Sequence, residues 1–271
     1  MLYNKIVGFR VFGWWISYYG LIIASGILLC LLLCDFICRK KKFDSNIPYV
    51  LVLIVIPLAI LGARLYYIIF SDKLTLAQFF DFSNGGFRGL AIYGGIIGGL
   101  LGVWIFSLIK KCSLITLTDL LAPLLMLGQS IGRWGNFFNQ EAYGWAVNFH
   151  FFPITVFIDN GFDYGPHLAT FFYESLLNFI GFWVLMRIFW RQKQYGTTTA
   201  AYLIWYGIVR AVIEPLRTDS LLIVPGNDFV FNRISFLISI AMVVGGMVLL
   251  YQSKKGRISQ NDQNLYQRDS K

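Results

Sequence analysis

The sequence predicts an all-α integral membrane protein with about seven transmembrane helices. Hydrophobic residues fill 57% of the 271 positions and charged residues only 14%, whereas soluble domains usually carry about 25% charged residues. The mean hydropathy is +0.62. Apolar runs of the length that crosses a bilayer recur along the chain. These observations exclude an ordinary soluble domain.

Polar or basic segments separate the predicted spans. The spans lie at about 14–37, 47–70, 90–109, 114–131, 168–190, 198–216 and 233–251. The third begins with closely spaced glycines, including Gly94, Gly98 and Gly102, a small-xxx-small pattern that lets helices approach closely in lipid. We expect residues 1–251 to form one polytopic membrane domain and residues 252–271 a polar cytoplasmic tail.

The distribution of basic residues predicts the direction of the spans. One side of the predicted membrane collects Arg39, Lys40, Lys41, Lys42, Lys110, Lys111, Arg191, Lys193, Lys254, Lys255 and Arg257. The other has only Lys5, Arg10, Lys73, Arg88 and Arg217 in segments of comparable length. Because positive residues mark the cytoplasmic side, the N-terminus is predicted outside and the C-terminus in the cytoplasm. The outer end of the fourth span then faces the outer leaflet.

The formal net charge of +9 does not indicate a nucleic-acid partner, because the basic residues cluster in loops. Cys30, Cys34 and Cys38 recur every four residues and therefore line one face of a helix. With no histidine nearby to suggest zinc, we interpret them as small apolar residues. A disulfide framework and a metal site are not expected.

The most polar stretch, residues 128–144, reads GQSIGRWGNFFNQEAYG. Arg133 can hold a phosphate or carboxylate through two parallel hydrogen bonds. Asn136 and Asn139 can donate and accept, and Glu141 can accept a proton. The alternative is a polar turn between two transmembrane helices. So many polar groups at a membrane edge favour a binding or catalytic site.

A second polar group lies in the sixth span. Tyr206, Arg210 and Glu214 are four residues apart, so they share one stripe of a helix. Charged residues inside a membrane are costly unless they pair or face a wet cavity. One interpretation is a structural Arg210–Glu214 ion pair. The other is that Arg210 and Arg133 form a clamp for a lipid phosphate at the outer leaflet.

The stretch GRWGNFFNQEAYG resembles the signature G-R-x-G-N-F-x-N-x-E-x-x-G of bacterial prolipoprotein diacylglyceryl transferases. The matching positions are Gly132, Arg133, Gly135, Asn136, Phe137, Asn139, Glu141 and Gly144. The motif Y-G-x-x-R-x-x-x-E at 206–214 also resembles the family, in which the arginine is regarded as essential. The resemblance extends from about residue 18 to about residue 250.

Single positions resemble the family more weakly. Tyr19 stands in a family-like Y-G-L, although a tyrosine near a helix end also serves as an interface anchor. Arg64 stands in G-A-R-L-Y-Y and needs a partner or a polar cavity; Asp119 is one candidate partner, or else a cap of the fourth span. Residues 173–175 read Y-E-S as in the family, but the preceding proline is missing and His167 is one residue too far away.

Tyr93 departs from the histidine that many family members carry before two glycines, which argues against a histidine base. Tyr93 is expected to position an oxygen atom of the substrate by hydrogen bonding. The proton of the substrate's cysteine thiol would then pass to Glu141 or to water. The alternatives are that Tyr93 is itself the general base or that it is only an interfacial aromatic. By resemblance, the catalytic residues are Arg133, Arg210, Tyr93 and Glu141. The phosphatidylglycerol-binding residues are Arg133, Asn136, Tyr19, Tyr206, Arg210, Glu214 and Gly144.

The resemblance implies an enzyme of the bacterial plasma membrane. It would transfer the sn-1,2-diacylglyceryl group of phosphatidylglycerol to the lipobox cysteine of a prolipoprotein and release glycerol 1-phosphate. The partners are then phosphatidylglycerol, prolipoprotein signal peptides and the lipid bilayer, with no cofactor, metal or nucleic acid. The alternatives are a transporter for an anionic solute, which predicts an internal repeat or paired broken helices, and a non-catalytic lipid-binding protein.

Overall fold

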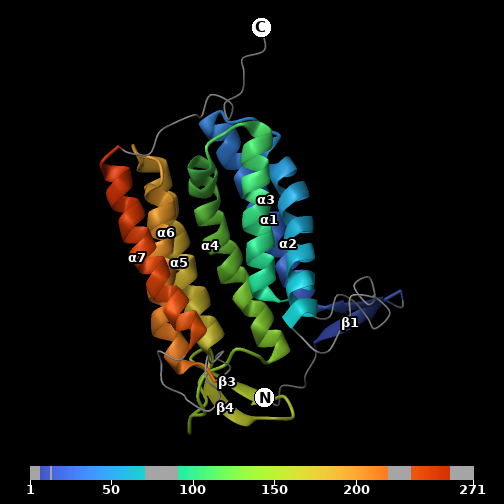
Figure 1. Cartoon of the computed structure of the whole chain (residues 1–271). Coiled ribbons are helices and arrows are strands. Elements are labelled where there is room, and N and C mark those ends of the chain that lie inside the picture. Colours follow the sequence, from blue (N-terminus) through green and yellow to red (C-terminus); the bar gives the residue numbers. More distant parts are fainter. Residues whose placement is uncertain (1–6, 13, 71–90, 219–232, 257–271) are drawn as a thin grey trace. The chain divides into compact units, whose positions relative to one another are not determined.

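The computed structural model describes residues 7–12, 14–70, 91–218 and 233–256, and these are mostly helical (Figure 1). The helices are α1 (Tyr18–Lys41), α2 (Ile47–Phe70), α3 (Ile92–Lys110), α4 (Leu114–Asn139), α5 (Thr170–Arg191), α6 (Thr197–Ile213) and α7 (Ile234–Lys254), with a 3-10 turn, η2 (Glu214–Leu216), after α6. The strands form two antiparallel hairpins, β1 (Gly8–Val11) with β2 (Trp14–Ser17) and β3 (Thr155–Asp159) with β4 (Tyr164–Leu168). The predicted fold class is confirmed.

Six of the helices in the described part of the chain are long and apolar enough to cross a membrane. The exception is α6, which has 17 residues. Its sequence is still apolar, and η2 continues it to Leu216, where the sixth span was predicted to end. The chain is therefore a multi-pass membrane protein, while the predicted orientation of its spans stays a prediction.

Helix α1 differs from the first predicted span at both ends. Residues 14–17, expected to be helical, pair with β1 instead, and the N–H of Tyr18 donates to the carbonyl of Val7 at 3.0 Å. The helix then runs four residues past the predicted end at 37, to Lys41, and in this last part Arg39 forms an i,i+4 ion pair with Asp35 at 2.7 Å. Basic residues in the last turn also stabilise a helix, because their positive charges interact favourably with the negative end of the helix dipole.

Helix α4 extends eight residues beyond the predicted end of the fourth span, from Ile131 to Asn139. Most of the polar stretch is therefore helical, and the interpretation of that stretch as a turn is wrong. Main-chain hydrogen bonds close the helix, from the N–H of Gln140 to the carbonyl of Phe137 and from the N–H of Glu141 to that of Asn136. The positive φ of Gln140 and of Ala142, 52° and 55°, turns the chain away.

The chain divides into two compact units. Unit 1 contains Met1–Cys30 and Thr118–Ser259, and unit 2 contains Leu31–Leu117 and Gln260–Lys271. In unit 2 the glycines of α3 pack against α2, as their spacing predicted. A Cβ on Gly102 would come within 2.9 Å of the Cα of Val55, and one on Gly98 would strike the main chain of Leu58. This close approach needs glycine at both positions.

The connection between α1 and α2 is tied to the end of α3 within unit 2. The carboxylate of Asp44 accepts the N–H of Asn46 and the ammonium group of Lys110, both at 2.9 Å. The Asn46 N–H first, and the Lys110 ammonium next, hold the pKa of Asp44 below its usual value. This ion pair is partly exposed and contributes little to stability.

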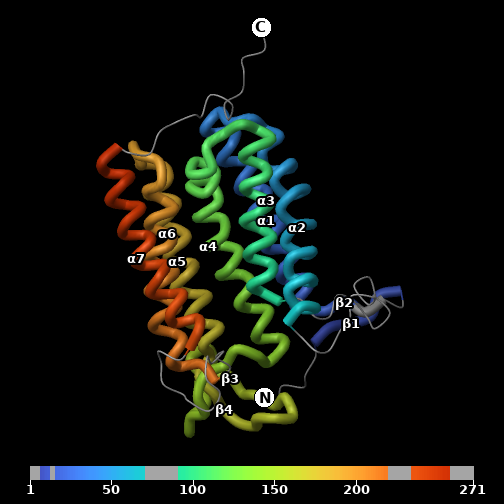
Figure 2. The backbone as a smooth tube through the Cα atoms, viewed as in Figure 1, coloured from blue at the N-terminus to red at the C-terminus, as the bar shows by residue number. Residues whose placement is uncertain are grey.

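In unit 1, helices α5, α6 and α7 lie side by side (Figure 2). Small residues again allow close packing: a Cβ on Gly207 of α6 would come within 2.7 Å of the carbonyl oxygen of Ser239 on α7. Between α5 and α6, the indole N–H of Trp205 donates to the carbonyl of Leu177 at 3.1 Å. Such contacts replace the hydrophobic effect as the source of helix association in lipid.

Asp119 of α4 caps the N-terminus of α6. One carboxylate oxygen accepts the N–H and the hydroxyl of Thr199 at 2.8 and 2.6 Å, and the other accepts the N–H of Gly196 at 2.7 Å. The amide of Gln192, at the end of α5, donates to Asp119 at 3.1 Å. Asp119 is fully buried. It therefore joins three helices, whereas the sequence suggested a cap on its own helix or a partner for Arg64.

We expect Asp119→Ala to destabilise the protein by about 2–4 kcal/mol, because two buried N–H donors lose their acceptor. The measurement is the thermal denaturation midpoint of the purified protein in detergent. Asp119→Asn is the matched control, since its amide oxygen can keep part of the cap, and its midpoint should lie between the other two. Equal midpoints for Asp119→Ala and the wild type would contradict the capping role.

The hairpin β3–β4 is held against the end of α4. The amide oxygen of Gln140 accepts the N–H of Asp159 at 3.0 Å, and the hydroxyl of Tyr143 donates to Asp163 at 2.5 Å. Val156 and Ile158 of β3 form a small core with Phe171 of α5. Trp134 and Phe137 of α4 pack against this core, as do Tyr143 and Phe172. The hairpin lies between the predicted fourth and fifth spans and contacts both α4 and α5.

Candidate catalytic site

The last turns of α4 carry Arg133 and Asn136 on one face, because they are three residues apart. The guanidinium Nη1 of Arg133 lies 3.5 Å from the amide oxygen of Asn136. Gly135 gives space for the first turn of α1: a Cβ there would come within 2.6 Å of the ring of Tyr19. The structure therefore brings Tyr19 against the signature helix, and glycine is required at the contact.

Glu141 follows α4 directly and is held by the two asparagines of the signature. The same carboxylate oxygen accepts the side-chain amide of Asn136 at 3.0 Å and that of Asn139 at 3.1 Å. The two amide groups hold the Glu141 carboxylate in one orientation, and Glu141 is nevertheless exposed. An exposed, oriented carboxylate can take up a proton from an incoming substrate.

Glu174 connects the two polar constellations, which the sequence placed on different spans. One carboxylate oxygen accepts Nη2 of Arg133 at 2.6 Å, and the other accepts Nη1 of Arg210 at 3.0 Å. Sequence reasoning assigned Glu174 no role. Two features of the sequence could have indicated a role for Glu174. It belongs to the family-like Y-E-S motif, and it lies in the first turns of an apolar span, where a carboxylate needs a partner.

The Arg210–Glu214 ion pair proposed as a structural feature exists, with Nη2 and a carboxylate oxygen 2.5 Å apart. It belongs to a larger group, because Arg210 binds Glu174 as well. Both glutamate side chains are 1% exposed, while those of Arg133 and Arg210 are 17% and 11% exposed. The carboxylates are thus enclosed and the arginines remain partly open. We call Arg133, Glu174, Arg210 and Glu214 the ionic cluster.

The surroundings of the ionic cluster tie η2 to the signature. Arg233, before α7, donates to the main-chain carbonyl of Glu214. Gly144 forms an antiparallel bridge with Arg217. A Cβ on Gly144 would come within 2.7 Å of the carbonyl oxygen of Leu216 and within 2.8 Å of the Cβ of Leu168. Gly144, predicted to bind phosphatidylglycerol, therefore has a clear packing reason to be glycine, and its contact with lipid stays a prediction.

Tyr206 lies one helical turn from Arg210 on α6 and stacks on Tyr202, with ring centroids 5.8 Å apart and planes 3° apart. The hydroxyl of Tyr202 accepts the side-chain amide of Gln129 from α4 at 2.9 Å. These contacts hold Tyr206 between α4 and α6. Tyr206 is on the same helix as Arg210, and its role in binding phosphatidylglycerol stays a prediction.

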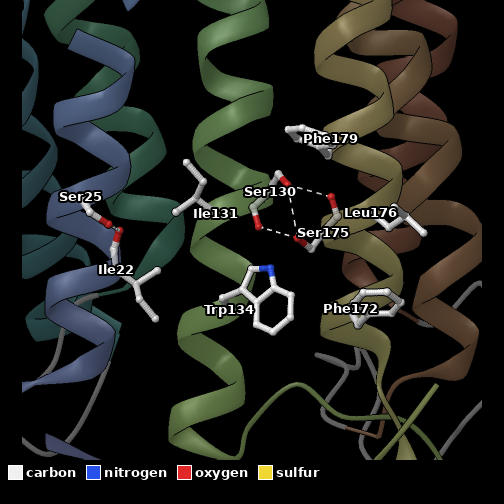
Figure 3. A pocket seen from close by; sticks show the side chains of 9 residues that line it. All are labelled: Ile22, Ser25, Ser130, Ile131, Trp134, Phe172, Ser175, Leu176 and Phe179. Carbon is white, nitrogen blue, oxygen red and sulfur yellow. Dashed lines mark hydrogen bonds between the residues drawn. The ribbon is translucent and has the colours of Figure 1, made fainter. Parts of the chain in front are cut away.

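An apolar pocket of about 410 Å³ is lined by residues of α1, α4 and α5 (Figure 3). It is lined by Ile22, Ser25, Ser130, Ile131, Trp134, Phe172, Ser175, Leu176 and Phe179. The two serines at its base, Ser130 and Ser175, each donate to the other's main-chain carbonyl at 2.8 Å. Their polar groups are therefore satisfied between the helices, and the lining is left largely apolar.

Tyr93 lies on α3 in unit 2, where its ring centroid is 6.3 Å from that of Tyr66. The ionic cluster belongs to unit 1, so the presence of Tyr93 in the same site stays a prediction. His167 is buried, with Nδ1 3.0 Å from the carbonyl of Gly165 and its ring edge-on to Tyr143. The sequence suggested a loop histidine, which is wrong, because His167 lies in β4 and pairs with Val156 of β3.

Comparisons with known proteins agree with the motifs. Residues 7–252 match the sequence-family model described as prolipoprotein diacylglyceryl transferase. A phosphatidylglycerol–prolipoprotein diacylglyceryl transferase of Clostridium kluyveri is 41% identical over 257 residues, which are 93% of this chain and 98% of the relative. The protein of the same name from Streptococcus pneumoniae strain JJA is 41% identical over 248 residues, 89% of this chain and 91% of the relative. The chain belongs to the prolipoprotein diacylglyceryl transferase family.

Proposed function

We propose that this protein transfers the sn-1,2-diacylglyceryl group of phosphatidylglycerol to the lipobox cysteine thiol of a prolipoprotein. The observation that carries the proposal is the ionic cluster, in which Arg133 and Arg210 converge on one carboxylate from two different helices. Two partly exposed guanidinium groups inside an apolar bundle are suited to a lipid phosphate. The names of the relatives give the substrates.

The proposed chemistry is a displacement at carbon. The cysteine thiolate attacks the glyceryl CH₂ that carries the phosphate, a C–S bond forms, and the C–O bond to phosphate breaks. The leaving oxygen keeps the electron pair and departs as glycerol 1-phosphate. The thiol pKa is about 8.5, so a proton acceptor or a positive field assists formation of the thiolate. No metal or cofactor takes part in this step.

The residues have distinct proposed roles. Arg133 and Arg210 stabilise the negative charge that grows on the leaving phosphate. Glu141, held by Asn136 and by Asn139, accepts the proton of the thiol. Tyr19 and Tyr206 lie beside these groups and help to bind phosphatidylglycerol, together with Glu214 and Gly144. The apolar pocket accepts part of an acyl chain, and the site faces the outer leaflet of the plasma membrane.

The direct test is incubation of the purified protein with phosphatidylglycerol and a lipobox peptide. We expect mass spectrometry to detect a diacylglyceryl thioether and an equal amount of glycerol phosphate. A peptide with serine in place of the lipobox cysteine is the control. Flux of an anionic solute in proteoliposomes without thioether formation would favour a transporter instead, and lipid binding without glycerol phosphate would favour a non-catalytic protein.

Tyr93→Phe tests whether Tyr93 takes part. If Tyr93 positions a substrate oxygen, the variant should lose one hydrogen bond to a charged group, about 1.5–3 kcal/mol, and slow the reaction about ten- to a hundredfold. The pH–rate profile should keep its shape. Near-complete loss with a missing alkaline limb would make Tyr93 the base, and a wild-type rate would remove it from the site.

A further inference from the structure

Glu174 binds the donors that a phosphate would need. Its two oxygens accept N–H groups from different arginines, Arg133 at 2.6 Å and Arg210 at 3.0 Å. Phosphate oxygens accept hydrogen bonds from the same guanidinium donors. An incoming phosphate and the Glu174 carboxylate therefore compete for the guanidinium groups.

The charge of the ionic cluster depends on this residue. Arg133 and Arg210 contribute two positive charges, and Glu174 and Glu214 contribute two negative charges, so the four side chains together are neutral. Without the Glu174 carboxylate their sum would be positive. A positive site in an apolar bundle binds anions strongly, because little water screens it.

The reaction makes the phosphate more negative as it proceeds. Phosphatidylglycerol is a phosphodiester with one charge, whereas the glycerol phosphate product is a monoester that carries about −1.5 to −2 at neutral pH. Two arginines without a competitor would bind the product more tightly than the substrate. Release of the product would then limit turnover.

We propose that Glu174 is a resident competitor of phosphate: it holds both guanidinium groups in place and keeps the affinity for the glycerol phosphate product low enough for release. The inference rests on the proposed transfer reaction. Glu174 is a positioning residue here, since it acts through the arginines. Glu214 can play only part of this role, because among the arginines of the cluster it contacts Arg210 alone.

The test compares product binding by the full-length wild type, Glu174→Gln and Glu174→Asp in detergent. Isothermal titration calorimetry with glycerol 1-phosphate, and separately with inorganic phosphate, measures the affinity. Glu174→Gln keeps the shape and loses the charge, so we expect binding about tenfold tighter or more. Glu174→Asp keeps the charge and should stay within about threefold of the wild type. In turnover assays, kcat and the KM for phosphatidylglycerol of Glu174→Gln should both fall.

The control is Asp44→Asn, the same carboxyl-to-amide change in the partly exposed pair with Lys110; it should leave phosphate affinity unchanged. If Glu174 does not compete with phosphate for the two arginines, a folded Glu174→Gln will bind product no more tightly than the wild type, and the proposal fails. If Glu174→Gln does not fold, Glu214→Gln decides: tighter product binding supports the proposal and unchanged binding overturns it. Absence of thioether formation by the wild type would instead overturn the transfer function, since phosphate binding is measured without turnover.

Discussion

Arg133→Lys should fold normally and lose most of its transfer activity, with kcat about a hundredfold lower or more. Lysine can keep the ion pair with Glu174 as a point charge, so the cluster stays neutral. It cannot present a rigid fork of N–H donors to Asn136 and, in place of Glu174, to a phosphate. The measurement is thioether formation by mass spectrometry under single-turnover conditions.

The matched control for this variant is Arg39→Lys. Arg39 also pairs with a carboxylate, that of Asp35 at 2.7 Å, but its side chain is 66% exposed at the end of α1. Exposed ion pairs contribute little, so we expect wild-type activity and stability. A folded Arg133→Lys protein with near-normal turnover would show that the fork is not needed and would remove the phosphate clamp.

The double variant Arg210→Met with Glu214→Leu should fold yet remain inactive. It removes one positive and one negative charge from the ionic cluster, and Glu174 keeps Arg133 as its partner at 2.6 Å. Replacing a buried ion pair by apolar residues is often neutral or stabilising. The phosphate nevertheless loses Arg210, one of the two cations proposed to bind it. The negative charge of the transition state is then less well stabilised.

Single variants separate the two effects. Arg210→Met alone leaves Glu174 and Glu214 with one fewer cation, so we expect it to be both unstable and inactive, since an unpaired buried charge costs about 3–5 kcal/mol. Recovery of thermal stability in the double variant without recovery of activity would support the catalytic role of Arg210. Recovery of both would show that Arg210 and Glu214 are only a structural pair.

Much of the fold could be predicted from the sequence because lipid imposes simple rules. A span needs about 20 apolar residues, and small residues mark close helix contacts. The spans and the close packing of the α3 glycines therefore followed from the sequence, whereas the choice of α2 as the partner did not. Helix ends did not: Trp14–Ser17 forms a strand and α4 continues to Asn139, because tertiary contacts and end hydrogen bonds decide where a helix stops.

The candidate site could be predicted only in part. Arg133 and Arg210 were identified because arginines are rare and costly in spans. Glu174 was overlooked because its role depends on three helices meeting, which no local spacing reveals. Asp119 was ambiguous for the same reason: its hydrogen-bond partners Gly196 and Thr199 are distant in sequence. Partners within one helix follow from periodicity, whereas partners on separate helices need the structure.

The cap that Asp119 places on α6 bears on how this helix is inserted. With 17 residues and a rise of about 1.5 Å per residue, α6 is about 25 Å long, and η2 extends it toward the thickness of a hydrocarbon core, about 30 Å. The first N–H groups of a helix have no acceptor within the helix, and unsatisfied donors are expensive in a membrane. Because α4 is synthesised before α6, its carboxylate is already in the membrane when α6 enters. Because of this order along the chain, the acceptor for the first N–H groups of α6 is present when α6 is inserted.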